Sequence, residues 1–390
     1  MKKLHMAIVA LALHAAAVNA QTAPPPGIWA QIPNTQIYPV MPAEGKREGS
    51  SGGTPELWNP RALFGFSGAD VARINGVWGF LIWGGGHAGT PDNSLYWEPF
   101  DGSGAKRLMG PYLAPDKVYL YVEPVETYRS VSRNAPSTVT VAAAPKSRHT
   151  YSSLLYIQIN GKPAVFNYGG SLYVGSGQGS IATYVFDLAQ TYEQAMSRPD
   201  MGWILRAQAP GPAVSSSSGW DPAHRRVVTR SRGFIGAYYP DTDKWENWNI
   251  RNAPWGADFQ ASVAMDPAGR KMYVIGDRLA EVIDLDSKGY TDLRGKLWAA
   301  EIPGVGKGNF QGPGVAWHAR SKQIVVWVGG NNLMLINPAT DTFKTITMGG
   351  VAVPQPPSAG TYGRFRIIPD TDQVVLVNAV DQDVFIGTLP

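Results

Sequence analysis

The stretch from Asp221 to Trp248, DPAHRRVVTRSRGFIGAYYPDTDKWENW, contains the unit that decides the fold. The turn Asp221-Pro-Ala-His-Arg precedes a very apolar strand expected at Val228–Gly233. A third strand runs into the turn Pro240-Asp-Thr-Asp, and a Trp-containing strand follows at Lys244–Trp248. Short apolar runs bounded by Asp, Pro and Gly are typical of antiparallel strands joined by tight turns. With a short strand before Asp221, the stretch predicts a four-stranded meander.

The same unit recurs along the chain. Its second strand is expected at Met272–Gly276, Ile324–Gly330 and Val374–Asn378, with longer copies at Trp78–Gly86 and Ala164–Gly170. Each of these strands is apolar enough to be buried on both faces of a sheet. The later copies are spaced by roughly 50 residues, a period found in propeller repeats. We therefore predict an all-β fold, a single β-propeller of about six four-stranded blades, with seven blades left open.

The last unit stops after its third strand at Pro390. Gly27-Ile-Trp-Ala-Gln-Ile near the N-terminus has the composition of the Trp-containing fourth strand of the other units. Pairing it with the last unit would cover an open sheet edge. We expect the ring to be closed in this way, by an N-terminal strand that joins the last blade.

Three double-glycine strand ends carry a family resemblance. Trp83-Gly-Gly-Gly-His87, Asn167-Tyr-Gly-Gly170 and Val328-Gly-Gly330 resemble those of kelch and galactose-oxidase-like β-propellers. The resemblance implies the fold and leaves the activity open, because this architecture carries many unrelated functions. A copper radical enzyme like galactose oxidase is disfavoured, since its crosslinked cofactor requires a cysteine and this chain has none.

The first twenty residues have the pattern of a signal peptide. Lys2 and Lys3 precede the apolar run Met6–Val18, and Ala20 ends a small-residue cleavage site. Residues 21–390 are then one kelch-like propeller domain, in which 110–146 form a loop insertion and Leu188–Asp200 a short amphipathic helix. A secreted or periplasmic protein is expected, a monomer without a membrane-spanning segment.

Charge and composition narrow the possible partners. Loss of Lys2 and Lys3 lowers the formal net charge from +4 to +2, and no dense Lys/Arg tract remains, so nucleic acid is an unsuitable partner. The lack of cysteine excludes thiol nucleophiles and Cys-ligated zinc. No cofactor is predicted; a structural or catalytic divalent cation stays open.

The propeller topology sorts polar residues onto two faces. His224 and His318 fall in turns between first and second strands, where turn chemistry explains them. The opposite face collects the connections that follow the second and fourth strands, and we expect the functional site there. The expected catalytic residues are His87, His149 and Tyr151. The expected substrate-binding residues are Arg148, Arg230, Arg232, Asp277, Arg278, Asn309, Gln311, Asn331, Tyr362 and Arg364.

Histidine, tyrosine and arginine on one face suit β-elimination from a uronate-containing polysaccharide. Arginine offsets the carboxylate charge, histidine accepts a proton and tyrosine returns one. The set is loosely similar to propeller polysaccharide lyases such as ulvan lyases, although their motif spacing does not match. Trp83, Trp97, Tyr168 and Tyr173 are expected to rim the site and contact the sugar chain.

Two alternatives remain. A non-catalytic propeller could bind an acidic glycan or a protein through the same face. A sialidase-like glycoside hydrolase would need paired acids, for which Asp277 and Asp92 are the candidates.

Overall fold

A computed structural model describes residues 23–42, 60–86, 90, 92–111, 126–127, 140–141, 144–172, 179–211, 213–231, 234–250, 260–277, 279–302 and 312–390. The predicted signal peptide and most of the predicted insertion lie outside these residues. Within the insertion, the structure describes only short pieces, among them β6 (Glu126–Thr127) paired with β7 (Thr140–Val141).

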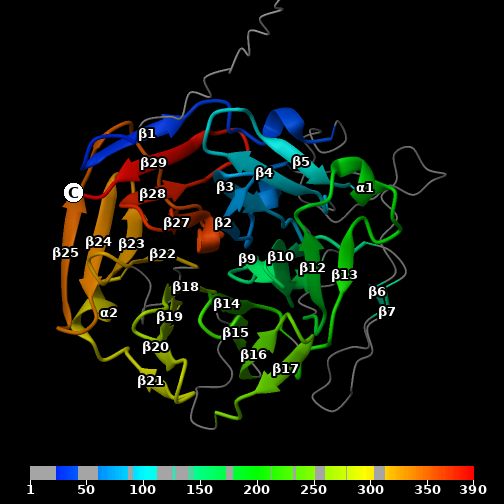
Figure 1. Ribbon diagram of the computed structural model, residues 1–390. Helices are drawn as coiled ribbons and strands as arrows, with labels where there is room; N and C mark the ends of the chain where they lie inside the picture. The colour runs from blue at the N-terminus through cyan, green and yellow to red at the C-terminus, as the bar shows by residue number, and fades with distance from the viewer. Residues whose placement is uncertain are drawn as a thin grey trace, which may run out of the picture.

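The chain is a six-bladed β-propeller, and Figure 1 shows the six sheets around a common centre. The first three blades, each given from its first to its fourth strand, are β2 (Ala69–Ile74), β3 (Val77–Ile82), β4 (Leu95–Pro99), β5 (Lys106–Met109); β9 (Leu155–Ile159), β10 (Lys162–Tyr168), β12 (Thr183–Asp187), β13 (Trp203–Leu205); and β14 (Ser216–Asp221), β15 (Arg226–Ser231), β16 (Ile235–Tyr239), β17 (Lys244–Asn247). The last three are β18 (Ala261–Asp266), β19 (Lys271–Gly276), β20 (Leu279–Asp284), β21 (Tyr290–Asp292); β22 (Gly314–His318), β23 (Gln323–Gly329), β24 (Asn332–Asn337), β25 (Thr342–Thr347); and β27 (Phe365–Ile367), β28 (Gln373–Leu376), β29 (Val384–Thr388), β1 (Ile28–Ile32).

The first strand of every blade is the innermost one. These strands contact one another in a closed series, from β2 through β9, β14, β18, β22 and β27 back to β2. The second strands are almost wholly buried, as their apolar sequences predict; β15 is buried at all six positions. The predicted four-stranded meander is thereby confirmed in each blade.

The N-terminal strand lies in the last blade, as predicted. β1 pairs antiparallel with β29, with Trp29 opposite Gly387, and the blue and red strands lie together in Figure 1. One feature was not predicted: β26 (Gly349–Gly350) pairs in parallel with the outer side of β1 and makes this sheet five-stranded. The chain leaving β25 thus covers the edge that β1 would otherwise expose.

Helices occupy only a few connections. α1 (Tyr192–Met196) lies inside the predicted helical segment and begins with a capping box, in which Thr191 and Gln194 bond each other's backbone N–H groups. The other helical segments of the described ranges are α2 (Leu297–Glu301) and the 3-10 turns η1 (Tyr38–Val40), η3 (Pro60–Phe64) and η4 (Tyr362–Arg364). In the part of the chain that the structure describes, no helix is long and apolar enough to cross a membrane.

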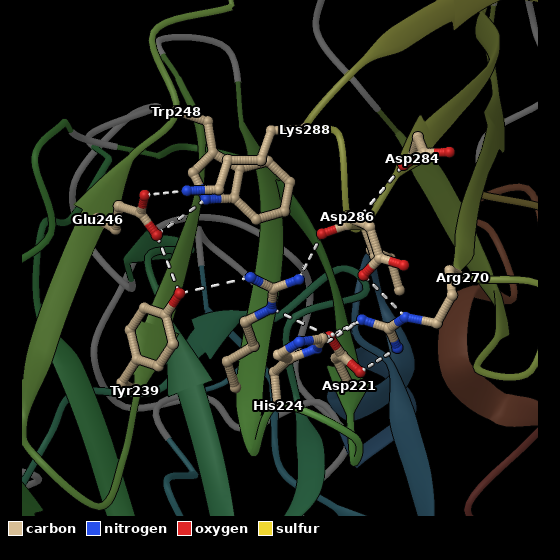
Figure 2. A network of polar contacts seen from close by, with 11 residues as sticks. Asp221, His224, Tyr239, Glu246, Trp248, Arg270, Asp284, Asp286 and Lys288 are labelled. Atoms are coloured by element: carbon tan, nitrogen blue, oxygen red, sulfur yellow. Dashed lines mark hydrogen bonds and ion pairs between the residues drawn. The ribbon is translucent and has the colours of Figure 1, made fainter.

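The face that carries the turns between first and second strands, here called the turn face, holds ion pairs between blades. The buried carboxylate of Asp221 accepts hydrogen bonds from Arg270 of the next blade, with Nη1 and Nη2 at 2.6 and 2.8 Å. Nε of Arg226 donates to it at 3.0 Å, and Nδ1 of His224 lies 2.7 Å from Arg270 (Figure 2). Between blades 5 and 6 the acid lies on the later blade instead of the earlier one: Nε2 of His318 in blade 5 lies 2.9 Å from Asp372 in blade 6. The predicted turn position of His224 is confirmed, whereas His318 is the last residue of β22, directly before the turn.

Candidate functional site

The opposite face, here called the loop face, carries the connections that follow second and fourth strands. Its most unusual feature is a group of four side chains, Phe66, His149, Tyr151 and Tyr362, here called the aromatic cluster. They come from the connections that lead into β2, β9 and β27, on three successive blades of the ring. The ring centroids of His149 lie 4.9 Å from Phe66 and 5.9 Å from Tyr151. The Tyr151 ring also meets Tyr362 edge-on at 5.6 Å.

Three of the four residues have a strained backbone. Phe66, Tyr151 and Tyr362 have φ angles of 52°, 48° and 49°, in the left-handed region that bulky residues avoid. Each such conformation costs on the order of 1–3 kcal/mol and persists only where the surroundings enforce it. Three strained residues whose rings are linked through Tyr151 mark the cluster as a candidate site.

Several contacts enforce this conformation. The N–H of Tyr151 donates to the carbonyl of Phe66 at 2.9 Å, and the N–H of Tyr362 to the carbonyl of Gly312 at 2.8 Å. Gly312 has φ of +48°, and a Cβ there would lie 2.2 Å from the Tyr362 ring. The hydroxyl of Thr150 accepts from the N–H of Gly68 and donates to the carbonyl of Trp83, which ties the cluster to blade 1.

His149 lies in a short two-stranded sheet beside the triple glycine. β8 (Arg148–His149) pairs with β11 (Ser171–Leu172), and a Cβ on Gly86 would lie 2.3 Å from the backbone nitrogen of His149. Only glycine permits so close an approach of two main chains. His87, which follows Gly86 directly in the sequence, lies outside the described residues. The loop that carries His87 therefore meets the loop of His149 at Gly86. The position of His87 itself stays a prediction.

The cluster holds buried hydroxyl groups. His149 and Tyr151 are 5% and 6% exposed and Tyr362 is 0% exposed. Among the described residues, the hydroxyl of Tyr362 has no hydrogen-bond partner. The same is true of the hydroxyls of Ser152, which follows Tyr151, and Thr361, which precedes Tyr362. Burial and the neighbouring Tyr151 raise the pKa of Tyr362 well above its usual value, against the opposing charge of Arg364. The Tyr362 phenol therefore stays protonated and can act as a donor.

The three predicted arginines that the structure describes are all fully buried. Arg148 donates to the carbonyls of Lys146 and Gly169 and lies over the rings of Trp83 and Tyr184, 5.4 and 5.0 Å from their centroids. Arg230 is paired with Glu281, Nε to Oε1 at 2.7 Å.

Within the described residues, Arg364 donates its hydrogen bonds to main-chain carbonyls, those of Ser67, Gly360, Val377 and Asn378. It thereby joins the residue after Phe66 to the segment that carries Tyr362. Burial lowers the pKa of Arg364 to about 9, against the charges of Tyr362 and Glu98. The guanidinium groups of Arg148, Arg230 and Arg364 thus hold strands and loops in position.

The remaining predicted residues are dispersed. Asn331 bridges the loop after β25, donating to the carbonyl of Met348 and accepting from the N–H of Val353. Asp277 is half-buried at the end of β19, on the far side of the ring from β2. The other five predicted residues lie outside the described residues: His87, Arg232, Arg278, Asn309 and Gln311.

The prediction of an aromatic rim was wrong for three of its four members. Trp83 and Trp97 are buried in the core between blades 1 and 2, and Tyr168 in the core between blades 2 and 3. Their side chains pack between neighbouring sheets, which burial in a propeller requires of large apolar residues. Tyr173 lies outside the described residues. Conversely, sequence reasoning missed Phe66, which occupies no position of the repeat.

The two acids needed for a sialidase-like site lie on different blades. Asp92 is buried in the connection between β3 and β4, where it accepts the hydroxyl of Tyr96 at 2.6 Å. Burial raises its pKa. Asp277 follows β19, in blade 4. A search of the described ranges for three or more His, Asp or Glu side chains able to hold a metal ion finds none.

No protein-family model matches the sequence, and a search of curated proteins found no similar chain. Two solved structures share part of the architecture. One is described as the extracellular domain of a candidate one-component system from B. thetaiotaomicron, with 11% identity, a TM-score of 0.42 and coverage of 82% of this chain. The chain spans 40% of the length of that structure. The other is a nidogen/laminin complex, with 13% identity, a TM-score of 0.35 and coverage of 67% of this chain and 88% of that one. Neither likeness bears on function.

Proposed function

We propose that the protein is a lyase for an acidic polysaccharide and that the aromatic cluster of the loop face is its working site. The observation that supports this most directly is the pairing of His149 with Tyr151, whose rings lie edge-on with centroids 5.9 Å apart. An imidazole and a phenol side by side supply the base and the acid that β-elimination requires. The strained backbone around them is the kind of feature that active sites retain.

In the proposed reaction, His149 takes the C5 proton of a uronate unit. The electron pair of that C–H bond forms the C4=C5 double bond as the C4–O bond breaks. The Tyr151 hydroxyl gives its proton to the leaving oxygen. The carboxylate next to C5 must be neutralised for this proton to become acidic, and we assign that role to Arg232, one of the arginines that the sequence predicts to bind substrate.

The buried arginines take a positioning role in this proposal. Arg364 anchors the loops that carry Phe66 and Tyr362, and Arg148 anchors strand β8, which carries His149. The predicted signal peptide supports secretion or periplasmic export, where extracellular polysaccharides are encountered.

The test is to incubate the mature protein with a panel of uronate polysaccharides and follow the ultraviolet absorbance of unsaturated products. Tyr151→Phe keeps the ring contacts and removes the transferable proton, so we expect a rate loss of about 10²–10⁴-fold. Tyr168→Phe is the matched control, since it removes another buried loop-face hydroxyl, one that donates to the carbonyl of Gly211. An unchanged rate in Tyr151→Phe, or no product from any substrate, would refute the lyase.

One observation counts against catalysis and thereby favours a second candidate, a propeller that binds a glycan without cleaving it: elimination needs a cation beside the uronate carboxylate. The guanidinium groups of Arg230 and Arg364 are committed to Glu281 and to main-chain carbonyls, and neither is exposed to a ligand. Retention on an acidic-glycan column without formation of unsaturated product would identify this binding function.

A further inference from the structure

A second concave site lies on the turn face, between blade 1 and the helix of blade 2. The cavity has a volume of about 430 Å³, within the range of small-molecule sites. α1 contacts β5 here, and Figure 1 shows the two elements next to each other. Its wall includes Trp97, Asp101, Lys106, Arg107, Gln190 and Tyr192. The strands of blade 1 separate this cavity from the loop face.

The charged groups of the cavity favour an anion. Lys106 and Arg107 contribute two positive charges, and the carboxylate of Asp101 accepts the N–H of Ser103 at 2.9 Å. Nη1 of Arg107 is buried and has no hydrogen-bond partner among the residues that the structure describes. A buried guanidinium N–H without an acceptor is unfavourable, and a carboxylate oxygen is the acceptor that it binds most strongly.

The aromatic groups of the cavity favour a ligand with apolar faces. The Arg107 guanidinium lies over the Tyr192 ring, 5.6 Å from its centroid, so ring and cation stand together at the wall. Trp97 lies buried against the hydrophobic core of the blade and lines the same cavity. Aromatic rings accept the C–H faces of sugar rings, while a neighbouring cation binds a substituent of opposite charge.

We infer that this cavity binds a carboxylate-bearing saccharide of up to about two sugar rings. Arg107 bonds the carboxylate, and the Tyr192 ring contacts the sugar. The site shares no residue with the aromatic cluster and does not depend on the function proposed for that cluster. It would hold the chain of an acidic polysaccharide, or its fragment, on the side opposite the loop face.

Isothermal titration of the full chain with digalacturonate, beside its methyl ester as the uncharged counterpart, tests this inference. We expect binding of the acid to weaken about tenfold in Arg107→Gln and in Tyr192→Ala, and to exceed binding of the ester by a similar factor. Lys344→Gln removes an exposed cation from the outermost strand of another blade and should leave binding unchanged. His149→Ala removes only a binding event at the aromatic cluster and should leave the event that Arg107→Gln weakens.

Hydroxyl-radical footprinting of the unaltered chain gives a readout that needs no variant. Digalacturonate should protect Tyr192 from oxidation and leave the exposed Tyr38 unprotected. Absence of binding, equal binding by Arg107→Gln, or exposure of Tyr192 at saturating ligand would each overturn the inference. Loss of all binding in His149→Ala with full binding in Arg107→Gln would assign the ligand to the loop face instead.

Discussion

The ion pair between blades 3 and 4 can be tested by replacing Asp221 with Asn. The substitution keeps the size of the side chain and removes the negative charge between Arg226 and Arg270. Arg226 is itself buried and would be left facing an amide. Breaking a buried ion pair from one side costs on the order of 3–5 kcal/mol, because the remaining charge is uncompensated.

The pKa of Asp221 gives an independent magnitude. Burial alone would raise it, but the hydrogen bonds and charges of Arg270 and Arg226 more than reverse this and hold it at about 2, below the ordinary 3.8. Such a lowering corresponds to about 2.5 kcal/mol of stability at neutral pH. We therefore expect Asp221→Asn to lower the free energy of unfolding by about 2–4 kcal/mol at pH 7.

The pH dependence follows from the direction of this pKa change. The native carboxylate binds a proton less readily than the unfolded one, so its contribution is fully present well above pH 3.8. It is lost as the pH falls toward about 2. The difference in stability between the two chains should accordingly shrink between about pH 4 and pH 2.

The assay is urea unfolding followed by tryptophan fluorescence at several pH values. Asp266→Asn is the matched control: Asp266 occupies the same position in blade 4 and accepts the N–H of Gly269 at 2.8 Å. In the described part of the chain it pairs with no arginine or lysine, and an asparagine oxygen can still accept that N–H. An equal loss in both variants, or a difference that does not change with pH, would refute the inter-blade ion pair as its source.

Three further predictions concern buried groups. Burial, followed by the charge of Asp383, raises the pKa of Glu98 well above its usual value despite Arg364. The native side chain therefore holds its proton more tightly than the unfolded one, and wild-type stability should fall as the pH rises above about 4.5, by up to about 1.4 kcal/mol per pH unit until the native carboxyl ionises. Glu98→Gln should remove that fall, and parallel pH profiles of the two chains would contradict the assignment. Gly312→Ala should lower stability by about 1–3 kcal/mol, because it adds a clash with Tyr362 to the strain of a positive φ. Gly161→Ala, at a positive φ with open space around it, should cost distinctly less in the same urea titration. Trp29→Ala should lower the free energy of unfolding by about 3–5 kcal/mol, since Trp29 packs the closing strand β1 into the last blade. The control Tyr38→Ala, at an exposed side chain, should change it by less than about 0.5 kcal/mol. Similar losses in the two variants would argue against closure by β1.

Strands and turns were readable from the sequence because their signals are local. Asp-Pro-Ala at residues 221–223 and again at 266–268 sets a tight turn whatever surrounds it, and the strand that follows each is apolar throughout. The missing fourth strand of the last unit could be assigned to Ile28–Ile32 because an incomplete meander leaves an open edge. The topology then sorted connections to the correct face, which brought His149, Tyr151 and Tyr362 into one prediction.

Only the tertiary structure decided what individual side chains do. Sequence does not distinguish an arginine that faces a ligand from one that is buried, because the distinction depends on partners distant in the chain, such as Glu281 for Arg230. Phe66 joins the aromatic cluster through contacts with His149 and Tyr151 of another connection, and no local pattern marks it. Trp83 and Trp97 turned inward because the neighbouring blade supplies the apolar surface that buries them. Local periodicity specifies strands, but the burial of each side chain depends on the packing of one sheet against the next.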